Sequence, residues 1–361
     1  MADRGRVVAV NPLSWVAGGE TTLLRLLPRL AERGWQVSAT VPAHGRLGDA
    51  LAAAGVPVRR LPLGPPERRT AGAYTGALAA PAILRGNDVC LLNGLSTQRA
   101  VPGLRLLRTP AVLLVNNPLE RPPPAWANRR HWDTVRAVAA ASDHVAAECR
   151  TAGAPADLVH TAYPAGWDGP QPPGASAPPP AGQHVGFVGQ IEPRKGVLEL
   201  IEAARSFLAD RPDAHLTIVG EAAHREDHYA RQVRDAAGAL DRVQLAGFRE
   251  DAAAAMAEFD LVVVPSLAEP YGTVSAEAAA AGRPAVISDV GGMAEVVLDG
   301  VTGLHVPPGD PGALAAAVGQ LLDDPERMRS MGAAALKRAG RFAPGAYADT
   351  IDGLLREAVS R

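Results

Sequence analysis

Two glutamates stand eight positions apart in a segment that follows the apolar run at 261–264. Pro270 disfavours helix at this point, so we expect Glu269 to lie in a loop. Glu277 should lie about one turn inside a helix that begins near Thr273. Because carboxylates accept hydrogen bonds from hydroxyl groups, the segment predicts that Glu277 binds a pair of vicinal hydroxyls, with Glu269 ahead of it. Each acid also has an ordinary interpretation, as a first-turn residue favoured by the helix dipole or as a solvated loop charge.

The start of that helix can bind an anion. Backbone N–H groups without an intrahelical partner and the helix dipole favour negative charge at a helix N-terminus. Gly272 has no Cβ to block a ligand, and Thr273 can serve as the N-cap residue. We therefore predict a phosphate over Gly272, Thr273 and Val274, with Tyr271 in the same turn.

A second turn carries the positive charge that a phosphate requires. The apolar run at 185–188 leads into a loop with Gln190, Arg194 and Lys195, and then into a helical segment. A lysine ammonium pairs with phosphate as a point charge. Arg194 has two interpretations, a second phosphate contact or a solvated loop residue.

Short continuous apolar runs predict the strands that position these loops. Apolarity that is continuous rather than alternating is typical of strands buried on both faces of a parallel sheet. The expected strands are 6–10, 36–41, 56–61, 88–92, 111–115, 144–147 and 158–162 in the first half, and 185–188, 216–219, 243–245, 261–264, 285–287 and 303–306 in the second. Helical spacing at 20–33 and 46–54 falls between strands, so we predict an α/β fold with two doubly wound, Rossmann-like domains.

The domain boundaries follow from length and from one proline-rich segment. A chain of 361 residues exceeds the usual size of one domain. The stretch 166–183 is rich in proline and has no apolar periodicity, which predicts a linker. We expect an N-terminal domain at 1–165, a C-terminal domain at 184–340, and a final helix at 341–361 that can pack back on the first domain.

The E-x7-E spacing, together with Ser288–Gly292, Glu295 and Asp299–Gly303, resembles the retaining glycosyltransferases of family 4, which have the GT-B fold. The resemblance is strong over 184–325 and weak over 6–163. It implies two Rossmann-like domains that face each other across a cleft, the first for the acceptor and the second for a nucleotide-sugar donor. It also implies transfer of a hexose-type sugar, with retention, to a small-molecule, glycan or lipid acceptor, without a metal or other cofactor.

The resemblance also assigns roles to single residues. Lys195 matches a lysine that neutralises the donor diphosphate, whereas Gln190 stands where an arginine is usual. Gly18 and Gly19 match a glycine pair whose backbone comes close to the donor phosphate. Asn116 stands where the family has a histidine, and it can orient a sugar by hydrogen bonds but cannot hold a proton as imidazole does. The expected catalytic residues are Glu269, Lys195 and Asn116. The expected donor-binding residues are Gly18, Gly19, Gln190, Lys195, Glu269, Tyr271, Gly272, Thr273, Val274 and Glu277.

Other chemistry is less well supported. The sequence has no D-x-D triplet, no P-loop and no G-x-S-x-G motif. His224 and His228 have a helical spacing that suits a metal but lack the H-E-x-x-H order. Trp126 and Trp132 either line an acceptor pocket or belong to an amphipathic helix that covers the sheet.

Charge and cysteine content bear on partners and compartment. A net charge of -2 disfavours a general nucleic-acid binder. Residues 1–166 carry +8 and 167–361 carry -10, which indicates either mutually attracting domains or a basic face for an anionic acceptor or membrane lipid. Two widely spaced cysteines fit a reducing cytoplasm, and no apolar run is long enough for a membrane span. We read the N-terminal apolar stretch as a core strand rather than a signal peptide.

Two alternatives to a glycosyltransferase stay open. A GT-B scaffold can carry a related activity, such as sugar-nucleotide epimerisation or the coupling of non-sugar cyclitols. The departures at Gln190 and Asn116 are also compatible with a catalytically silent nucleotide-sugar binding protein. The donor base, the sugar, the acceptor and the oligomeric state do not follow from the sequence.

Overall fold

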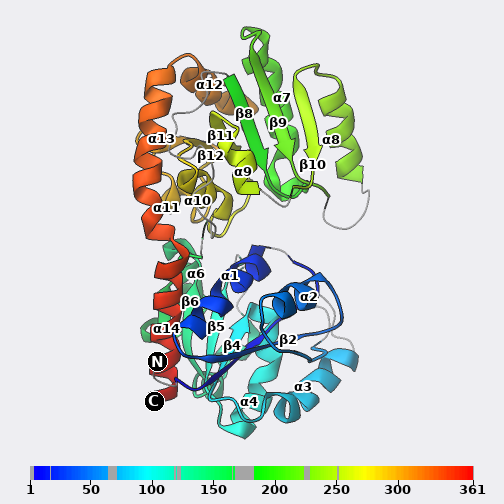
Figure 1. Cartoon of the computed structure of the whole chain (residues 1–361), viewed down its shortest axis with the longest axis vertical. Coiled ribbons are helices and arrows are strands. Elements are labelled where there is room, and N and C mark those ends of the chain that lie inside the picture. Colours follow the sequence, from blue (N-terminus) through cyan, green and yellow to red (C-terminus); the bar gives the residue numbers. More distant parts are fainter. Residues whose placement is uncertain are drawn as a thin grey trace. The chain divides into compact units, whose positions relative to one another are not determined.

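The computed structural model describes residues 4–16, 18–63, 71–117, 119, 123–164, 166, 183–222, 228–249 and 252–360. These residues form two compact units, one from Met1–Ala165 with Pro344–Arg361 and one from Gly166–Ala343. Each unit has its own parallel sheet with helices against it (Figure 1). Nearly all of the predicted linker, 167–182, lies outside the described residues.

The first unit contains a seven-stranded parallel sheet in the order β3-β2-β1-β4-β5-β6-β7. Its strands are β1 (Arg6–Val10), β2 (Gln36–Val41), β3 (Val58–Arg60), β4 (Val89–Asn93), β5 (Ala111–Val115), β6 (Val135–Ala140) and β7 (Val159–Thr161). The strand order reverses between β1 and β4, which pair directly. Ligands of open parallel sheets bind at such a reversal, at the carboxyl ends of the strands.

Helices cover both faces of this sheet. They are α1 (Gly18–Glu32), α2 (Arg46–Ala53), α3 (Ala71–Leu84), α4 (Val101–Leu107), α5 (Arg129–Trp132), α6 (Asp143–Thr151) and α14 (Pro344–Ser360), with short 3-10 turns η1 (Leu95–Ala100), η2 (Pro124–Ala127) and η3 (Ala156–Leu158). Apolar side chains of α1, α2 and α14 pack with Val7 and Ala9 on one face. Those of α3, α4 and α6 pack with Val8 and Val10 on the other. Burial on both faces explains the continuous apolarity of the strands.

The helix α14 joins the first unit although it is last in the chain. It packs against α1, β4, β5 and β6. Asp352 accepts hydrogen bonds from Arg4 Nη1 at 2.7 Å and from Trp35 Nε1 at 2.8 Å. These contacts attach α14 to the N-terminal strand region through a buried carboxylate.

The second unit contains a six-stranded parallel sheet in the order β10-β9-β8-β11-β12-β13. Its strands are β8 (Gln183–Val188), β9 (Ala214–Val219), β10 (Val243–Gly247), β11 (Leu261–Val264), β12 (Ala285–Ser288) and β13 (Gly303–Val306). Its helices are α7 (Val197–Ala209), α8 (His228–Gly238), α9 (Ala252–Ala257), α10 (Thr273–Ala280), α11 (Met293–Val296), α12 (Pro311–Leu322) and α13 (Pro325–Ala339), with 3-10 turns η4 (Pro193–Lys195) and η5 (Gly340–Phe342). The order reverses between β8 and β11, the strands that precede the two predicted loops.

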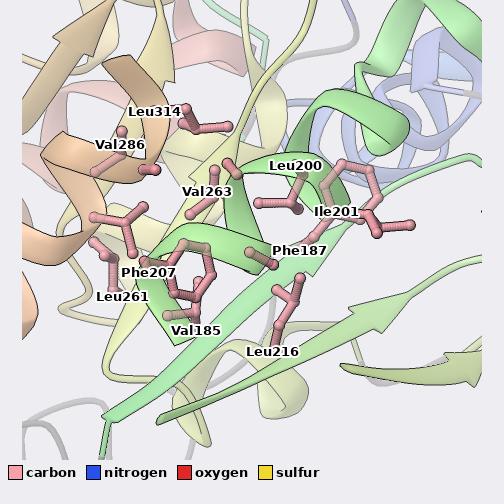
Figure 2. Packing of buried hydrophobic residues seen from close by; sticks show 14 of the residues in the cluster. Val185, Phe187, Leu200, Ile201, Phe207, Leu216, Leu261, Val263, Val286 and Leu314 are labelled. Atoms are coloured by element: carbon pink, nitrogen blue, oxygen red, sulfur yellow. The ribbon is translucent and has the colours of Figure 1, made fainter. Parts of the chain in front are cut away.

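The core of the second unit joins β8, β11 and α7. Figure 2 shows Val185 and Phe187 of β8 in one cluster with Leu261 of β11 and Phe207 of α7. Gly186 allows a further close contact on β8, because a Cβ there would lie 1.9 Å from the Phe259 ring. The absence of a side chain at this strand position lets an aromatic ring pack directly on the backbone.

One strand prediction was wrong. Residues 144–147, predicted as a strand, lie in α6, and the strand at this place is β6 (Val135–Ala140). Ser142 caps α6 by accepting a hydrogen bond from the Val145 N–H at 3.1 Å, and Asp143 lies in the first helical turn. Arg136 interrupts the apolar run of β6, so the criterion of continuous apolarity does not identify this strand. The other predicted strands are present, several with ends shifted by one or two residues.

Cys90 and Cys149 are free thiols buried in the first unit. Burial raises the pKa of both thiols, which keeps them protonated. Across the part of the chain that is described, no helix has both the length and the apolarity needed to cross a membrane.

Candidate functional site

An ion pair joins two of the predicted catalytic residues. Lys195 Nζ lies 2.6 Å from Glu269 Oε2, with 15% and 11% of the two side chains exposed. Lys195 belongs to the loop between β8 and α7, and Glu269 to the loop between β11 and α10. The reversal of strand order between β8 and β11 therefore brings together residues that are 74 positions apart.

Backbone contacts hold these two loops against each other. The Leu267 N–H donates to the Arg194 carbonyl at 2.8 Å. Gly196 has φ of +67°, and a Cβ there would lie 2.0 Å from the Pro265 carbonyl oxygen. Only glycine combines this backbone conformation with such an approach. The position of Lys195 thus depends on the glycine that follows it.

Arg194 also lies at this site. Its guanidinium donates to the Ala268 carbonyl at 3.1 Å and to Glu192 Oε1 at 2.6 Å. The same group lies 3.6 Å from Glu269 Oε2, so two cations flank one carboxylate. Arg194 is therefore held in the loop rather than projecting freely into solvent.

The helix α10 begins at Thr273, as expected, but its N-cap residue is Gly272 and not Thr273. Gly272 has φ of +96°, which a threonine would adopt only with strain. Thr273, Val274 and Glu277 are each partly exposed, whereas the intervening Ser275 and Ala276 are buried. Spacings of three and four residues put Thr273, Val274 and Glu277 on one face of the helix. The first turn of α10 thus offers backbone N–H groups, and Glu277 follows them on the same face.

The remaining predicted residues of the second unit differ in exposure. Gln190 is partly exposed just beyond β8. Tyr271 is only 2% exposed, and its ring packs edge-on against Phe342 with centroids 6.1 Å apart. Sequence reasoning included Gly291 in the segment Ser288–Gly292 but gave it no role, and a Cβ there would lie 1.8 Å from the Glu269 carbonyl oxygen. The loop after β12 therefore supports the backbone of Glu269, and the paired glycines after that strand were the available signal.

The predicted residues of the first unit gather at the carboxyl ends of β1, β4 and β5. Asn116 follows β5, and its Nδ2 donates to Asn93 Oδ1 at 3.4 Å. Gly18 and Gly19 open α1, and a Cβ on Gly19 would lie 3.6 Å from Asn116 Nδ2. Sequence reasoning missed Asn93 and gave no role to the buried Glu20 beside it. An asparagine at the end of each neighbouring strand was the signal, but strand adjacency was unknown.

Two further candidates from the sequence have structural explanations or fall outside the described residues. Trp126 is 3% exposed and donates from Nε1 to Gln98 Oε1 at 2.7 Å, so it belongs to the core rather than to an open pocket. His224 lies outside the described residues, and its pairing with His228 is not described. Within the described ranges, no three histidine, cysteine, aspartate or glutamate side chains are grouped to hold a metal ion.

Two protein families match consecutive parts of the chain. The family "Glycosyl transferase 4-like domain" matches residues 17–165, and "Glycosyl transferases group 1" matches residues 182–324. A D-inositol 3-phosphate glycosyltransferase of Segniliparus rotundus is 37% identical over 49% of this chain and 39% of its own length. An alpha-D-kanosaminyltransferase of Streptomyces kanamyceticus is 37% identical over 47% of this chain and 45% of its own length. The matches thus span less than half of these curated relatives.

Solved structures match almost the whole chain. Anabaena Alr3699/HepE, determined with UDP and glucose, has a TM-score of 0.82 at 22% identity and covers 97% of this chain and 99% of that protein. Sucrose-phosphate synthase of Thermosynechococcus elongatus has a TM-score of 0.79 at 22% identity and covers 99% of both chains. At this level of identity the likeness establishes a common fold.

Proposed function

Because the chain belongs to the glycosyltransferase family defined by these two matched domains and has the GT-B fold, we propose that it transfers a sugar from a nucleotide-diphosphate sugar to an acceptor. The acceptor is a small molecule, a glycan or a lipid. The reaction proceeds with retention and without a metal. The contact of Lys195 with Glu269 beside the start of α10 carries this proposal, because it combines a cation for phosphate with a carboxylate for hydroxyls.

The pair of Lys195 and Glu269 suits two successive tasks. The two charges neutralise each other at 2.6 Å. An entering diphosphate takes Lys195 as its partner, and Glu269 is released to accept from sugar hydroxyls. Arg194 supplies a second positive charge, and Gln190 contributes only neutral hydrogen bonds to the phosphates.

The negative charge that develops on the leaving diphosphate during transfer is stabilised by groups of the same site. The bond from the anomeric carbon to the leaving phosphate oxygen breaks through an oxocarbenium-like state. Lys195 and the backbone N–H groups of Gly272, Thr273 and Val274 stabilise the negative charge that grows on the diphosphate. The acceptor oxygen forms its new bond on the face that the diphosphate leaves, and the acceptor proton passes to a phosphate oxygen. This order of events gives retention and assigns no proton to Asn116.

The names of the relatives suggest which substrates to test first. UDP-glucose is the first donor, because structures of Alr3699/HepE were determined with UDP and with UDP-glucose. D-inositol 3-phosphate is the first acceptor, because it appears in the name of the relative from Segniliparus rotundus. In this assignment Glu277 holds the ribose hydroxyls, and Tyr271 supports the phosphate turn from the core.

Calorimetry with UDP-glucose tests the donor assignment. Glu277→Ala should weaken binding by about 1.5–3 kcal/mol, or roughly 10- to 150-fold, because hydrogen bonds to a carboxylate are lost. Glu326→Ala is the matched control, since Glu326 is an exposed acid in the first turn of another helix, α13. Equal affinities of the wild type and Glu277→Ala for the true donor would contradict the proposal.

Two departures from the family pattern favour a second candidate, a nucleotide-sugar binding protein without transferase activity. Asn116 cannot exchange a proton, and Gln190 carries no charge where the family has an arginine. Product analysis with UDP-glucose separates the candidates, because release of UDP or formation of a glycoside above background excludes a silent binder. An epimerised nucleotide sugar would instead identify a different activity on the same scaffold.

A further inference from the structure

The chain passes between the two units at two points, before Gly166 and after Ala343. Gly166 and Phe342, which lie at these points, are hydrogen-bonded to each other, because the Gly166 N–H donates to the Phe342 carbonyl at 3.0 Å. Gly166 is buried, and Phe342 is 2% exposed. The two connecting segments are therefore joined within the second unit.

Gly166 contacts the first turn of α10. A Cβ on Gly166 would lie 3.4 Å from Ala276 Cβ, so the backbone of residue 166 packs against this helix. Ala276 is 1% exposed, and its N–H donates to the Gly272 carbonyl at 3.2 Å. This is the same turn whose N–H groups, at Gly272, Thr273 and Val274, are assigned to the phosphates.

The ring of Phe342 contacts the residue that precedes this turn. Phe342 packs edge-on against Tyr271, with centroids 6.1 Å apart and an angle of 65° between the ring planes. Tyr271 is followed by Gly272, whose φ of +96° directs the chain into α10. A Cβ on Gly272 would lie 2.8 Å from Met293 Cγ, so Met293 of α11 also packs on the turn. Tyr271 and Gly272 are thus held by side chains from two other elements, η5 and α11.

Arg338 fixes the Phe342 ring from α13. Its guanidinium carbon lies 5.6 Å from the ring centroid, a distance typical of a cation–π contact. Arg338 Nη2 donates to the Glu295 carbonyl at 2.7 Å, and Nε donates to the Val296 carbonyl at 3.1 Å. The position of the Phe342 ring is therefore set by α13 and α11 as well as by Tyr271.

We propose that Phe342 is a positioning residue for the donor diphosphate, because its contact with the Tyr271 ring holds the turn at Gly272 whose N–H groups bind the phosphates. The inference rests on the proposed function, since it takes the anion at this turn to be the diphosphate of a nucleotide sugar. An edge-on aromatic pair has a preferred geometry, whereas an aliphatic side chain fills similar space without one. Phe342→Leu should therefore leave the turn folded but less precisely placed.

A double-variant cycle tests whether Phe342 acts through Tyr271. The dissociation constant of UDP is measured by calorimetry for the wild type, Phe342→Leu, Tyr271→Leu and the double variant. Each single variant should bind UDP about fivefold more weakly, the size expected for loss of an aromatic pair. The double variant should also lose about fivefold, because the second change removes nothing further. A loss of about 25-fold in the double variant, or an unchanged UDP affinity in Phe342→Leu, would overturn the proposal.

Two controls separate the positioning of the turn from a general loss of stability. Phe207→Leu is the matched variant, since Phe207 is a ring of α7 that is 1% exposed in the core of the same unit. It should lower Tm but leave the UDP affinity unchanged. Uridine, which has no phosphate, should bind Phe342→Leu as tightly as it binds the wild type in an NMR titration. An equal loss of UDP affinity in Phe207→Leu, or an equal loss for uridine in Phe342→Leu, would overturn the role of Phe342.

A spectroscopic experiment on the wild type covers the case in which Phe342→Leu fails to fold. The five phenylalanines are labelled with 13C in the ring, and Phe342 is assigned by its NOE contacts to Tyr271. Addition of UDP should shift the ring signals of Phe342 and leave those of Phe207 in place. Unmoved Phe342 signals at a UDP concentration that calorimetry finds saturating would overturn the proposal.

Hydrogen exchange tests the positioning of the turn without a ligand. The Ala276 N–H donates to the Gly272 carbonyl at one end of α10, and the Ala281 N–H donates to the Glu277 carbonyl at 3.0 Å at the other. Phe342→Leu should accelerate exchange at Ala276 about fivefold and leave Ala281 unchanged. Equal exchange at Ala276 in the wild type and Phe342→Leu would overturn the positioning role. Failure of UDP and of all nucleotide sugars to bind would instead contradict the proposed function, on which the exchange rates do not depend.

Discussion

The substitution Glu269→Gln should strengthen the binding of UDP while it reduces the turnover of UDP-glucose. Lys195 Nζ is held by Glu269 Oε2 at 2.6 Å, so a diphosphate must break this ion pair before it gains the ammonium group. Glutamine keeps the size of the side chain but loses its charge. Lys195 would then be more available to the phosphates of UDP, which has no sugar for residue 269 to bind.

The magnitude follows from the burial of the pair. Exposed ion pairs contribute about 0–1 kcal/mol, whereas loss of one partner from a fully buried pair costs about 3–5 kcal/mol. With 15% and 11% of the side chains exposed, and Arg194 also 3.6 Å from Glu269, the pair lies between these limits. We estimate about 1–2 kcal/mol for its disruption, which predicts a 5- to 30-fold gain in UDP affinity for Glu269→Gln.

Titration calorimetry at two salt concentrations measures this effect. Glu269→Gln should bind UDP more tightly than the wild type, and the difference should shrink at high salt because charged interactions are screened. The same variant should turn over UDP-glucose at least tenfold more slowly, since one charge-assisted hydrogen bond to the sugar is lost. Weaker binding of UDP by Glu269→Gln would refute the competition between the carboxylate and the diphosphate.

Two further predictions concern stability. Burial lowers the pKa of His131 to about 4 from an ordinary 6.5. Between pH 6.5 and pH 4 the imidazole is therefore protonated in the unfolded chain but neutral in the folded protein. The free energy of unfolding consequently falls as the pH falls. Relative to His131→Gln, the wild type should lose up to about 3 kcal/mol over this range, and equal pH profiles of Tm would contradict burial of His131 as a neutral ring. Gly186→Ala should cost about 1–3 kcal/mol in urea unfolding, because its Cβ would lie 1.9 Å from the Phe259 ring. Gly238→Ala, a helical position with open space around it, should be neutral or stabilising, and a similar loss in both variants would argue against the close packing at Gly186.

The parts of the fold that sequence predicts well are those whose signals are local. The run Leu261–Val264 is wholly apolar, and Pro270 and Gly272 follow it, so strand, loop and helix start could be read from one segment. The error at 144–147 also has a local cause. Residues 144–147 are mostly apolar and therefore resemble a short strand. In the sequence, Ser142 is only a possible N-cap residue, which favours a helix at the same place.

The parts of the site that sequence could not predict depend on which strands are neighbours. Lys195 and Glu269 were assigned to one site through a resemblance, but their direct contact requires β8 and β11 to pair. The contact of Asn116 with Asn93 requires β4 to pair with β5. Nothing local distinguishes these asparagines from residues that simply end a strand, so only the assembled sheet shows that they lie together.

The membership of α14 in the first unit has a consequence for synthesis of the protein. The apolar side of α1 and the sheet strands beneath it form one cluster with Tyr347, Ile351 and Leu355, which leave the ribosome after all of the second unit. During translation the apolar surface of the first unit that α14 later covers therefore stays exposed until residues 344–361 are made. By then the chain of the second unit is already complete. The order of folding should consequently run against the order of synthesis, and a nascent chain stalled before Pro344 should be a good substrate for chaperones.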